Sequence, residues 1–237
     1  MHYIVLDFEW NQPLSEKEML MEPFPFDSEI IEIGAIKLDE SFQTVDEFKT
    51  FIRPQFYPHL SNAVVQLTKI RPQELEKAPS FPEAFDTFID WCGDDCALCS
   101  WGPDDIPVLL DNMLLHGIPT EPFPYCYDLQ RIFARELLRE NRQCSLSDAV
   151  KMLKLPADRT HDALNDTRNT VRVCERMDMA GCIDEYRTAF VGYGADRKSG
   201  LISGLIYPSL DAALADTRVK EITCPYCGEQ VSLTVSP

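Results

Sequence analysis

The sequence predicts an α/β fold, with a mixed central sheet of about five strands and helices packed on both sides. Segments near residues 3–9, 29–38 and 44–53 are rich in β-branched and aromatic apolar residues, and we predict three consecutive strands there. Helical and strand-like patterns then alternate along the chain, which is the order expected for a sheet covered by helices. At 237 residues, with 45% hydrophobic and 26% charged residues, the chain has room for one substantial core.

The first predicted strand ends in an acidic pair. The apolar run of residues 4–6 is typical of a central strand that is covered on both faces. Because side chains alternate along a strand, Asp7 and Glu9 point to one face, about 7 Å apart, while Phe8 points to the other. Two such carboxylates repel each other unless a cation neutralises them. The pair therefore indicates either a cation site or a strand end that emerges into water.

A helix followed by a buried strand is predicted in the middle of the chain. The segment PSFPEAFDTFIDWC has its large apolar residues at helical spacing, which favours a core-facing helix. The following CALCSW predicts a buried strand that delivers Asp104 and Asp105 at its carboxyl end, as the first strand delivers its own acidic pair. Ligands bind at this edge of such sheets. The predicted core positions of the helix are Phe81, Ala84, Phe85, Phe88 and Trp91.

The sequence HDALND contains the only histidine that we single out. His161 and Asp166 are five residues apart, which places them about 140° apart around a helix, so they cannot share a face if both are helical. Asp162 suits the N-cap of a helix from Ala163 to about Met179. We therefore predict that the histidine lies on the preceding loop and Asp166 in the first turns. A capping aspartate beside a solvated histidine is the plain structural alternative.

Together these motifs resemble the DEDDh family of 3′-to-5′ exonucleases, the RNase T and DnaQ-like proteins with the RNase H-like fold. Asp-Phe-Glu follows an apolar strand, Trp-Gly precedes an aspartate, and His-x-Ala-Leu-x-Asp leads into a helix. Stretches such as EIIEIGAIKLD and FKTFIRP are similar to the subgroup of enhanced-RNAi and histone-mRNA 3′-end exonucleases and KapD-like proteins. The resemblance covers roughly residues 1–180, so residues 181–237 are predicted to be a C-terminal extension.

The resemblance implies a role for each acidic residue. In the subgroup the second motif is similar to Trp-Gly-x-aromatic-Asp, so placing Trp101 and Gly102 on its first two positions makes Asp105 the ligand. A register shifted by one residue selects Asp104 instead. The implied set is Asp7, Glu9, Asp105 and Asp166 as metal ligands, with His161 as the general base.

The chemistry of this set is that of phosphodiester hydrolysis. Hard oxygen ligands suit Mg²⁺ or Mn²⁺, and two such ions about 4 Å apart can hold the attacking water and the leaving oxygen. Imidazole changes protonation near neutral pH and can take a proton from water. The subgroup resemblance implies single-stranded RNA 3′ ends as substrate. The alternatives are a DNA proofreading or repair exonuclease, and a non-catalytic adaptor that keeps the fold to bind a partner.

Three residues near the acidic set are candidates for substrate contact. Trp10 can stack on a terminal base or belong to the core. In LTKI, Thr68 is followed by Lys69 where the family usually has a glycine in a substrate-facing loop, so the lysine either contacts a phosphate or is a solvated charge. Residues 11–28 form a proline-containing insertion that we expect to overhang the site.

The net charge of −17 argues against a nucleic-acid enzyme, because phosphate binding usually leaves a basic footprint. An exonuclease holds only a few nucleotides and uses metal ions for part of the neutralisation, so a local basic cluster can suffice. We therefore expect weak, salt-sensitive binding of short substrates. Residues 135–143 are polar enough for a surface segment but carry no motif that we can interpret. The candidate cluster, which ordinary surface charge also explains, comprises Lys69, Arg71, Arg159, Arg168 and Arg172.

The composition and the C-terminus give the remaining expectations. Nine cysteines without a secretion signal predict reduced thiols in a cytoplasmic protein, and no apolar run approaches the ~20 residues that span a bilayer. Cys224 and Cys227 form a Cys-x-x-Cys knuckle like those of zinc ribbons. Two ligands do not close a zinc site, so the others would come from elsewhere in the chain or from a second subunit in an oligomer. A redox role and a metal-free tail are the alternatives.

Overall fold

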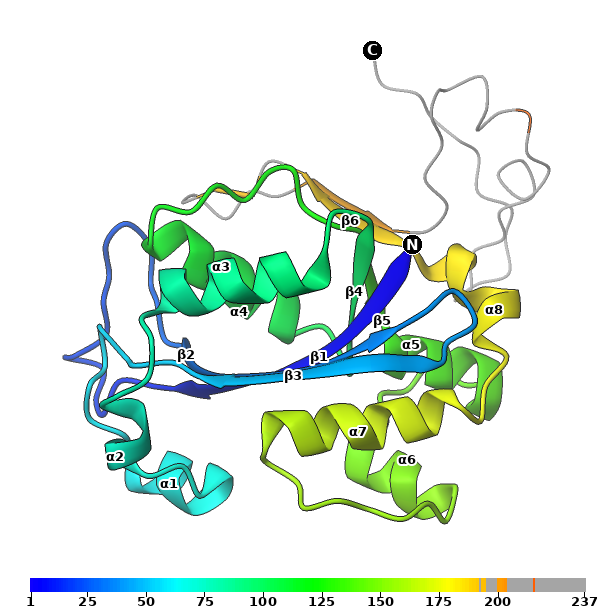
Figure 1. The fold of residues 1–237 in the computed structure, drawn as a ribbon, viewed down its shortest axis with the longest axis horizontal. Coiled ribbons are helices and arrows are strands. Elements are labelled where there is room, and N and C mark those ends of the chain that lie inside the picture. Colours follow the sequence, from blue (N-terminus) through cyan, green and yellow to red (C-terminus); the bar gives the residue numbers. More distant parts are fainter. Residues whose placement is uncertain (192, 195–199, 204–214, 216–237) are drawn as a thin grey trace.

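The computed structural model describes residues 1–191, 193–194, 200–203 and 215, and its centre is a mixed sheet (Figure 1). The strand order is β3-β2-β1-β4-β5-β6-β7, in which β1 pairs in parallel with β4 and β4 with β5, while the other pairs are antiparallel. The predicted α/β class is confirmed, and two short strands extend the sheet beyond the expected five. The strands are β1 (His2–Asn11), β2 (Glu29–Leu38), β3 (Thr44–Phe51), β4 (Cys96–Ser100), β5 (Cys126–Asp128), β6 (Thr188–Val191) and β7 (Gly200–Ser203).

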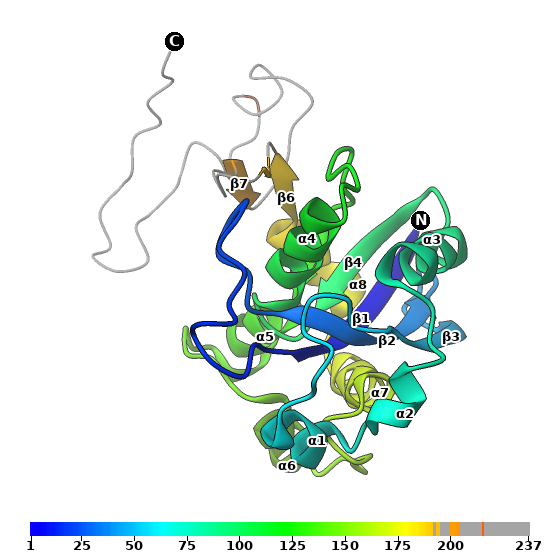
Figure 2. The ribbon, with the colours of Figure 1, turned by 90° about the vertical axis from the view of Figure 1, so that its left-hand side faces the viewer.

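Helices cover both faces of the sheet. Figures 1 and 2 show α3 (Phe81–Cys92) and α4 (Asp105–Leu115) on one side, with α7 (Ala163–Cys174) and α6 (Leu146–Met152) on the other. The strand β1 serves both layers, because Ile4, Leu6 and Phe8 belong to the core under α3 and α4, whereas Tyr3 and Val5 belong to the core under α7. The shorter helical segments are α1 (Asn62–Thr68), α2 (Pro72–Leu75), α5 (Leu129–Ile132), a π-helix (Phe133–Leu138), α8 (Met179–Cys182) and a 3₁₀ helix (Ile183–Tyr186).

The helix α3 forms where its apolar pattern predicts it. Its N-terminus has a capping box, in which the Glu83 carboxylate accepts from the backbone N–H of Ser80 at 2.8 Å. The first four of its predicted core residues are buried, while Trp91 is half-buried and packs against the same core. Trp91 Nε1 also donates to Asp46 at 2.9 Å, which explains why this end of the indole stays near the surface.

The helix α7 packs unusually close to β2. A Cβ atom on Gly34 would lie 2.2 Å from the carbonyl carbon of Ala163, so only glycine permits this contact. Thr167 Oγ1 donates to the Gly34 carbonyl at 3.1 Å and to Ala163 O at 2.7 Å. The predicted continuation to Met179 was wrong: the helix ends at Cys174, and Asp178 is the N-cap of α8, where it accepts from Gly181 N at 3.1 Å.

The insertion at residues 11–28 packs against the body of the protein. Phe24 and Phe26 are buried with Tyr57, whose hydroxyl accepts from Leu20 N at 3.1 Å. This small apolar cluster holds the segment away from the sheet edge that the sequence predicts as the site. Among the described residues, no helix combines the length and the apolar character that a membrane span requires.

Candidate active site

The acidic residues predicted from three separate motifs meet in one cleft. It lies at the carboxyl end of β1, has a volume of about 620 Å³, and is bounded by α1 and by the N-termini of α4, α6 and α7. We call it the carboxylate cleft. Of residues 11–28, which we expect to overhang the site, Gln12 lines the cleft. The predicted catalytic residues that line it are Asp7, Glu9, Asp105, His161 and Asp166, with Asp104 as a neighbour.

The end of β1 supplies two of the carboxylates. Phe8 is buried in the core under α3 and α4, and Asp7 and Glu9 line the cleft, as strand alternation predicts. Asp7 is half-buried and Glu9 is 8% exposed. The β1–β2 register shifts between Glu9 and Trp10, an irregularity of the kind that turns a strand end away from regular pairing.

Asp105 is joined to the end of β1 by a hydrogen bond to the backbone of Phe8. Its Oδ1 accepts from the backbone N–H of Phe8 at 3.2 Å, and its side chain is 6% exposed at the first position of α4. Asp104 is the N-cap residue, is exposed, and makes no side-chain capping bond. The geometry therefore favours Asp105 as the fourth carboxylate of the cleft.

His161 lies on the loop before α7, as predicted, in a left-handed backbone conformation with a φ of 62°. Its backbone N–H donates to Asp166 Oδ2 at 2.7 Å, and Asp162 caps the helix by accepting from Asn165 N at 3.2 Å. The side chain of His161 is exposed while Asp166 is buried. These bonds fix the histidine loop directly to the carboxylate that it accompanies.

The buried carboxylates raise one another's pKa. Burial, then the charges of Glu32 and Asp166, raise the pKa of Glu9 to about 8. Burial is also the main cause for Asp105, whose pKa rises to about 7 although the Phe8 amide opposes the shift. The pKa of Asp7 is raised well above its ordinary value by burial and by the charges of Asp105 and Glu9. A cation among these groups would remove much of this repulsion.

The donor set fits a divalent cation that prefers oxygen. Candidate ligand atoms of Glu9, His161 and Asp166 lie within 4.8 Å of one another. Asp166 Oδ1 is buried without a hydrogen-bond partner in the described structure, although such an atom usually has one. Carboxylate oxygens at this density are suitable ligands for Mg²⁺ or Mn²⁺.

A buried ion pair beside the cleft was missed by the sequence analysis. Glu32 is 1% exposed and lies directly opposite Glu9 in the β1–β2 pairing. The Lys49 ammonium is 2.6 Å from Glu32 Oε1 and 2.8 Å from Asp162 Oδ2, so one cation joins β3, β2 and the N-cap of α7. The available signal was Glu32 between two isoleucines of the predicted strand, because a buried carboxylate rarely occurs without a partner.

The predicted substrate residues have different positions. Trp10 and Thr68 line the cleft, and Trp10 also packs against the core, whereas its stacking on a terminal base stays a prediction. Thr68 Oγ1 donates to Val64 O at 2.9 Å and accepts from Ile70 N at 3.1 Å, so it shapes the turn after α1. Lys69 does not line the cleft; its exposed Nζ donates to Gln66 O. Its φ of 66° is in the region that favours glycine, which explains the glycine of the family motif.

An apolar wall of the cleft was also missed. Val64 and Leu67 of α1 line one side, and Trp101 at the end of β4 lines another. Leu67 is 51% exposed and so presents apolar surface to the cleft. The helical spacing of residues 64 and 67 was the only available signal.

The predicted basic cluster is largely neutralised by nearby carboxylates. Arg168 pairs with Glu47 at 2.5 Å and Arg172 with Asp158 at 2.8 Å. Arg159 is 3.9 Å from Asp162, while Lys69 and Arg71 are exposed. The arginines around α7 therefore support the helix and its cap more than they offer free charge. Cys224 and Cys227 lie outside the described residues, so zinc binding there stays a prediction.

Comparison with known proteins gives consistent matches. Residues 4–174 match the family model described as Exonuclease (RNase_T). Human 3′-5′ exoribonuclease 1 is 25% identical over 171 residues, which cover 68% of this chain and 49% of that protein. DNA polymerase III PolC-type of Thermotoga maritima is 32% identical over 176 residues, covering 74% and 12%. The chain thus spans about half, or much less, of these relatives' lengths.

A solved structure supports the same assignment. The nuclease domain of 3′hExo, a DEDDh family member bound to rAMP, has a TM-score of 0.65 and 25% sequence identity. The alignment covers 76% of this chain and 93% of that one. The likeness therefore extends over nearly the whole of that nuclease domain.

Proposed function

The chain belongs to the RNase T exonuclease family, in its DEDDh group, and from this premise we propose that it is a metal-dependent 3′-to-5′ exonuclease acting on single-stranded RNA. One observation carries the proposal: four carboxylates and a histidine from β1, α4 and the start of α7 line the same cleft. Burial is the main cause of the raised pKa values of Asp7, Glu9 and Asp105, and a cation bound among these carboxylates would lower them.

The proposed roles follow the placement of each side chain. Asp7, Glu9, Asp105 and Asp166 would hold two Mg²⁺ or Mn²⁺ ions, which when bound activate water and stabilise charge on the phosphoryl and leaving oxygens. His161 is exposed at the mouth and fixed through its backbone to Asp166, so its ring can accept a proton from the attacking water.

The apolar wall suits unpaired bases. Trp10, Leu67 and Trp101 line the cleft beside the carboxylates, and aromatic side chains such as the two tryptophans stack on bases without reading their sequence. A base in this position would bring the terminal phosphodiester towards the acidic set. Stacking of this kind requires a strand that is not paired, which agrees with a single-stranded end.

RNA is the first candidate substrate because the curated relative with this domain is a 3′-5′ exoribonuclease and the solved nuclease domain carries rAMP. DNA is the second, favoured by the match to a PolC-type DNA polymerase. Among the residues that line the described cleft, we assign none to the recognition of a 2′-hydroxyl. A direct comparison of RNA and DNA substrates therefore decides between the two.

The test is degradation of RNA and DNA oligonucleotides of one sequence, each labelled at the 5′ end, with magnesium and with EDTA. We expect stepwise shortening of RNA from the 3′ end, abolished by EDTA and by His161→Ala. Faster loss of DNA would select the second candidate. If well-folded protein shortens neither strand with magnesium or manganese, the enzymatic function is overturned. The adaptor hypothesis would then be the one that remains.

A second comparison tests the fourth carboxylate. Asp105→Asn should remove activity, whereas Asp104→Asn, a matched change on the adjacent exposed residue, should leave most of it. The reverse result would show that the motif register is shifted by one residue.

A further inference from the structure

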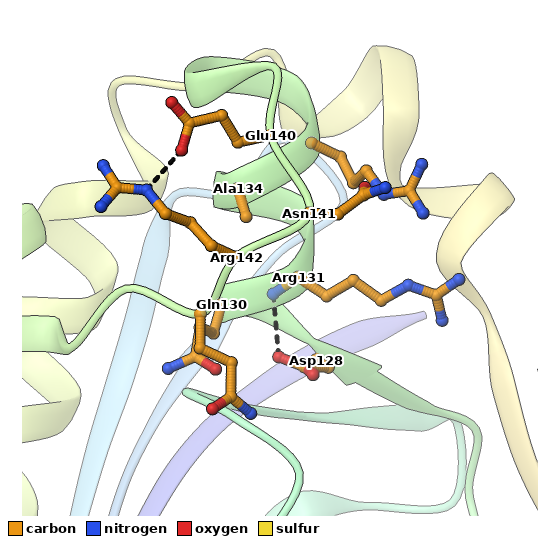
Figure 3. Close-up of a pocket in the computed structure, with 9 residues that line it drawn as sticks. Asp128, Gln130, Arg131, Ala134, Glu140, Asn141 and Arg142 are labelled. Atoms are coloured by element: carbon orange, nitrogen blue, oxygen red, sulfur yellow. Dashed lines mark hydrogen bonds and ion pairs between the residues drawn. The ribbon is translucent and has the colours of Figure 1, made fainter. Parts of the chain in front are cut away.

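A second cavity, next to the carboxylate cleft, gathers positive charge in a strongly acidic chain. It has a volume of about 310 Å³ and lies between α5, the π-helix and the loop that follows them (Figure 3). Three arginines line it, together with two carboxylates and several side-chain amides. We call it the arginine cavity and define it by Arg131, Arg135, Arg142, Gln130, Asn141 and Gln143.

The two carboxylates of the arginine cavity do not use up its positive charge. Asp128 accepts from the backbone N–H of Arg131 at 3.0 Å and so serves as the N-cap of α5. Glu140 pairs with Arg142, but these side chains are 49% and 67% exposed, and such surface pairs are weak and easily exchanged. Among the described residues neither Arg131 nor Arg135 has a carboxylate oxygen within ion-pair distance, although the Arg131 guanidinium lies over the Tyr186 ring at 5.9 Å and its charge also acts on Asp128. This differs from the arginines around α7, each of which lies near a carboxylate.

The arginine cavity and the carboxylate cleft share a wall. Trp101, which lines the cleft, donates through Nε1 to Cys144 O at 3.0 Å, and Gln130, which lines the cavity, donates to the same oxygen at 3.0 Å. Cys144 lies between Gln143 of the cavity and Ser145 of the cleft. A flexible strand that leaves the cleft past Trp101 therefore reaches the arginine cavity by crossing the contact between Trp101, Cys144 and Gln130.

The arrangement of charge fits an extended anion better than a compact one. Figure 3 shows the side chains of Arg131 and Arg142 extending in opposite directions, with Gln130 and Asn141 as neighbouring amides. A small anion is bound best by groups that converge on it, whereas separated guanidinium groups suit successive phosphates along a backbone. The exposed amides of Asn141 and Gln143 can donate to phosphate or sugar oxygens between them.

We propose that the arginine cavity binds the phosphodiester backbone of the substrate strand upstream of the bond that is cut. The inference rests on the proposed function for the identity of the strand. It explains how a chain with a net charge of −17 holds nucleic acid at all: the contact is local and lies on the far side of Trp101 from the acidic set. It also assigns a role to residues 135–143, which the sequence left without one.

The test separates binding from turnover. The full chain is titrated, in EDTA, with a 5′-fluorescent single-stranded RNA of about 12 nucleotides, and binding is followed by anisotropy at several salt concentrations. We expect the double variant Arg131→Gln/Arg135→Gln to weaken binding about tenfold. The slope of log K against log salt should fall in magnitude by about 0.7 for each phosphate that the variant no longer neutralises. Arg176→Gln, an exposed arginine beyond the far end of α7 from His161, is the matched control and should bind as the parent does.

Turnover gives a second readout and separates the possible sources of phosphate. With magnesium, the double variant should raise the KM for the long strand with little change in kcat, and should cleave a dinucleotide, which reaches only the cleft, at the parent rate. Adenosine monophosphate and inorganic phosphate serve as competitors. If the variant loses binding of either small anion while its affinity for the long strand is unchanged, the cavity is a free-anion site and the proposal is overturned.

The remaining outcomes are also decisive. Arginine-dependent binding of the strand without any turnover supports the cavity and removes the proposed enzymatic function. Turnover with equal affinity in parent and double variant keeps the enzyme and overturns the cavity. Parent protein that fails to bind the strand at low salt overturns the cavity as well. Circular dichroism of each variant checks that the substitutions of the exposed Arg131 and the half-buried Arg135 leave the fold intact.

Discussion

The two faces of the sheet are built in different ways. Under α3 the contacts are apolar and aromatic, with Phe85 and Phe88 in one core cluster with Ile4 and Leu6. Under α7 the helix buries polar residues, and Gly34 brings two backbones into direct contact. The first face stabilises the fold through apolar area, whereas the second positions His161 and Asp166 at the end of the strand that carries Asp7 and Glu9.

This difference assigns separate tasks to neighbouring residues. Phe8 and Glu9 are adjacent on β1 but belong to opposite faces, so one supports the core and the other lines the cleft. Substitutions on the α3 side should therefore change stability more than catalysis. Substitutions on the α7 side should affect catalysis first, because small displacements there move the reacting groups.

The largest expected effect is on the α7 side, from Glu9→Gln. The change keeps the shape of the side chain but removes a proposed metal ligand, so we expect exonuclease activity to fall about 10³-fold, equivalent to about 4 kcal/mol. Stability in EDTA should not fall, because glutamine is neutral at every pH, whereas Glu9 must take up a proton to be buried uncharged. Activity within threefold of the parent would remove Glu9 from the site.

On the opposite face, Phe88→Ala should reduce stability with little effect on the chemistry. Phe88 is fully buried among aromatic neighbours, and truncation of such a residue costs about 3–5 kcal/mol. Urea denaturation measures the loss, and kcat per folded molecule should stay close to that of the parent. Ile89→Ala, at an adjacent position that is 39% exposed, is the control and should cost well under half as much.

Gly34→Ala tests the close contact between α7 and β2. The added Cβ would lie 2.2 Å from backbone atoms of Ala163 and Leu164, so the helix must move. We expect a loss of about 2–3 kcal/mol in stability together with at least a tenfold fall in activity, since His161 and Asp166 move with the helix. Unfolding and initial rates are measured on the same samples. If activity per folded molecule is unchanged, α7 does not position the site.

The sequence predicted the α3 side better than the α7 side, for a physical reason. Apolar periodicity reports burial directly, so the alternating faces of β1, the bounds of β2 and four of the five core positions of α3 were predicted correctly. The end of α7 was missed because Asp178 continues the helical spacing while acting as an N-cap. Capping and periodicity compete there, and only tertiary contacts decide between them.

The candidate site was predictable in its members but not in its surroundings. Four carboxylates and a histidine could be named because their motifs resemble those of the DEDDh family, while strand alternation and a helix start predicted the direction of Asp7, Glu9 and His161. The Lys49 and Glu32 pair depends on which strands are neighbours, and the arginine cavity depends on a π-helix, for which no sequence pattern was available. Such features follow from three-dimensional proximity, which local pattern does not encode.

The stability of metal-free protein should depend on pH, because the carboxylates on the α7 side are buried and lie close together. The pKa of Glu9 is raised from 4.5 to about 8, so the folded state keeps a proton that the unfolded chain has released. Stability in EDTA should therefore fall as the pH rises from about 5 to about 8, by roughly 2 kcal/mol or about 5 °C in Tm, and level off above that. Thermal unfolding measures it. Magnesium should flatten the decline, and Glu9→Gln should reduce it; an equal slope in parent and variant would contradict the assignment.

The smallest expected effect concerns Lys69, which closes α1 beside the cleft. Its left-handed conformation, with φ at 66°, is unfavourable for a side-chain-bearing residue and natural for glycine. Lys69→Gly should therefore raise stability by about 0.5 kcal/mol, after the entropy cost of glycine is counted. Activity on a dinucleotide should stay within twofold, because Lys69 does not line the cleft, and Lys69→Ala, which keeps a Cβ, should give no stabilisation. A marked rise in KM in both variants would instead mean that the ammonium contacts the substrate, and that this turn belongs functionally to the cleft.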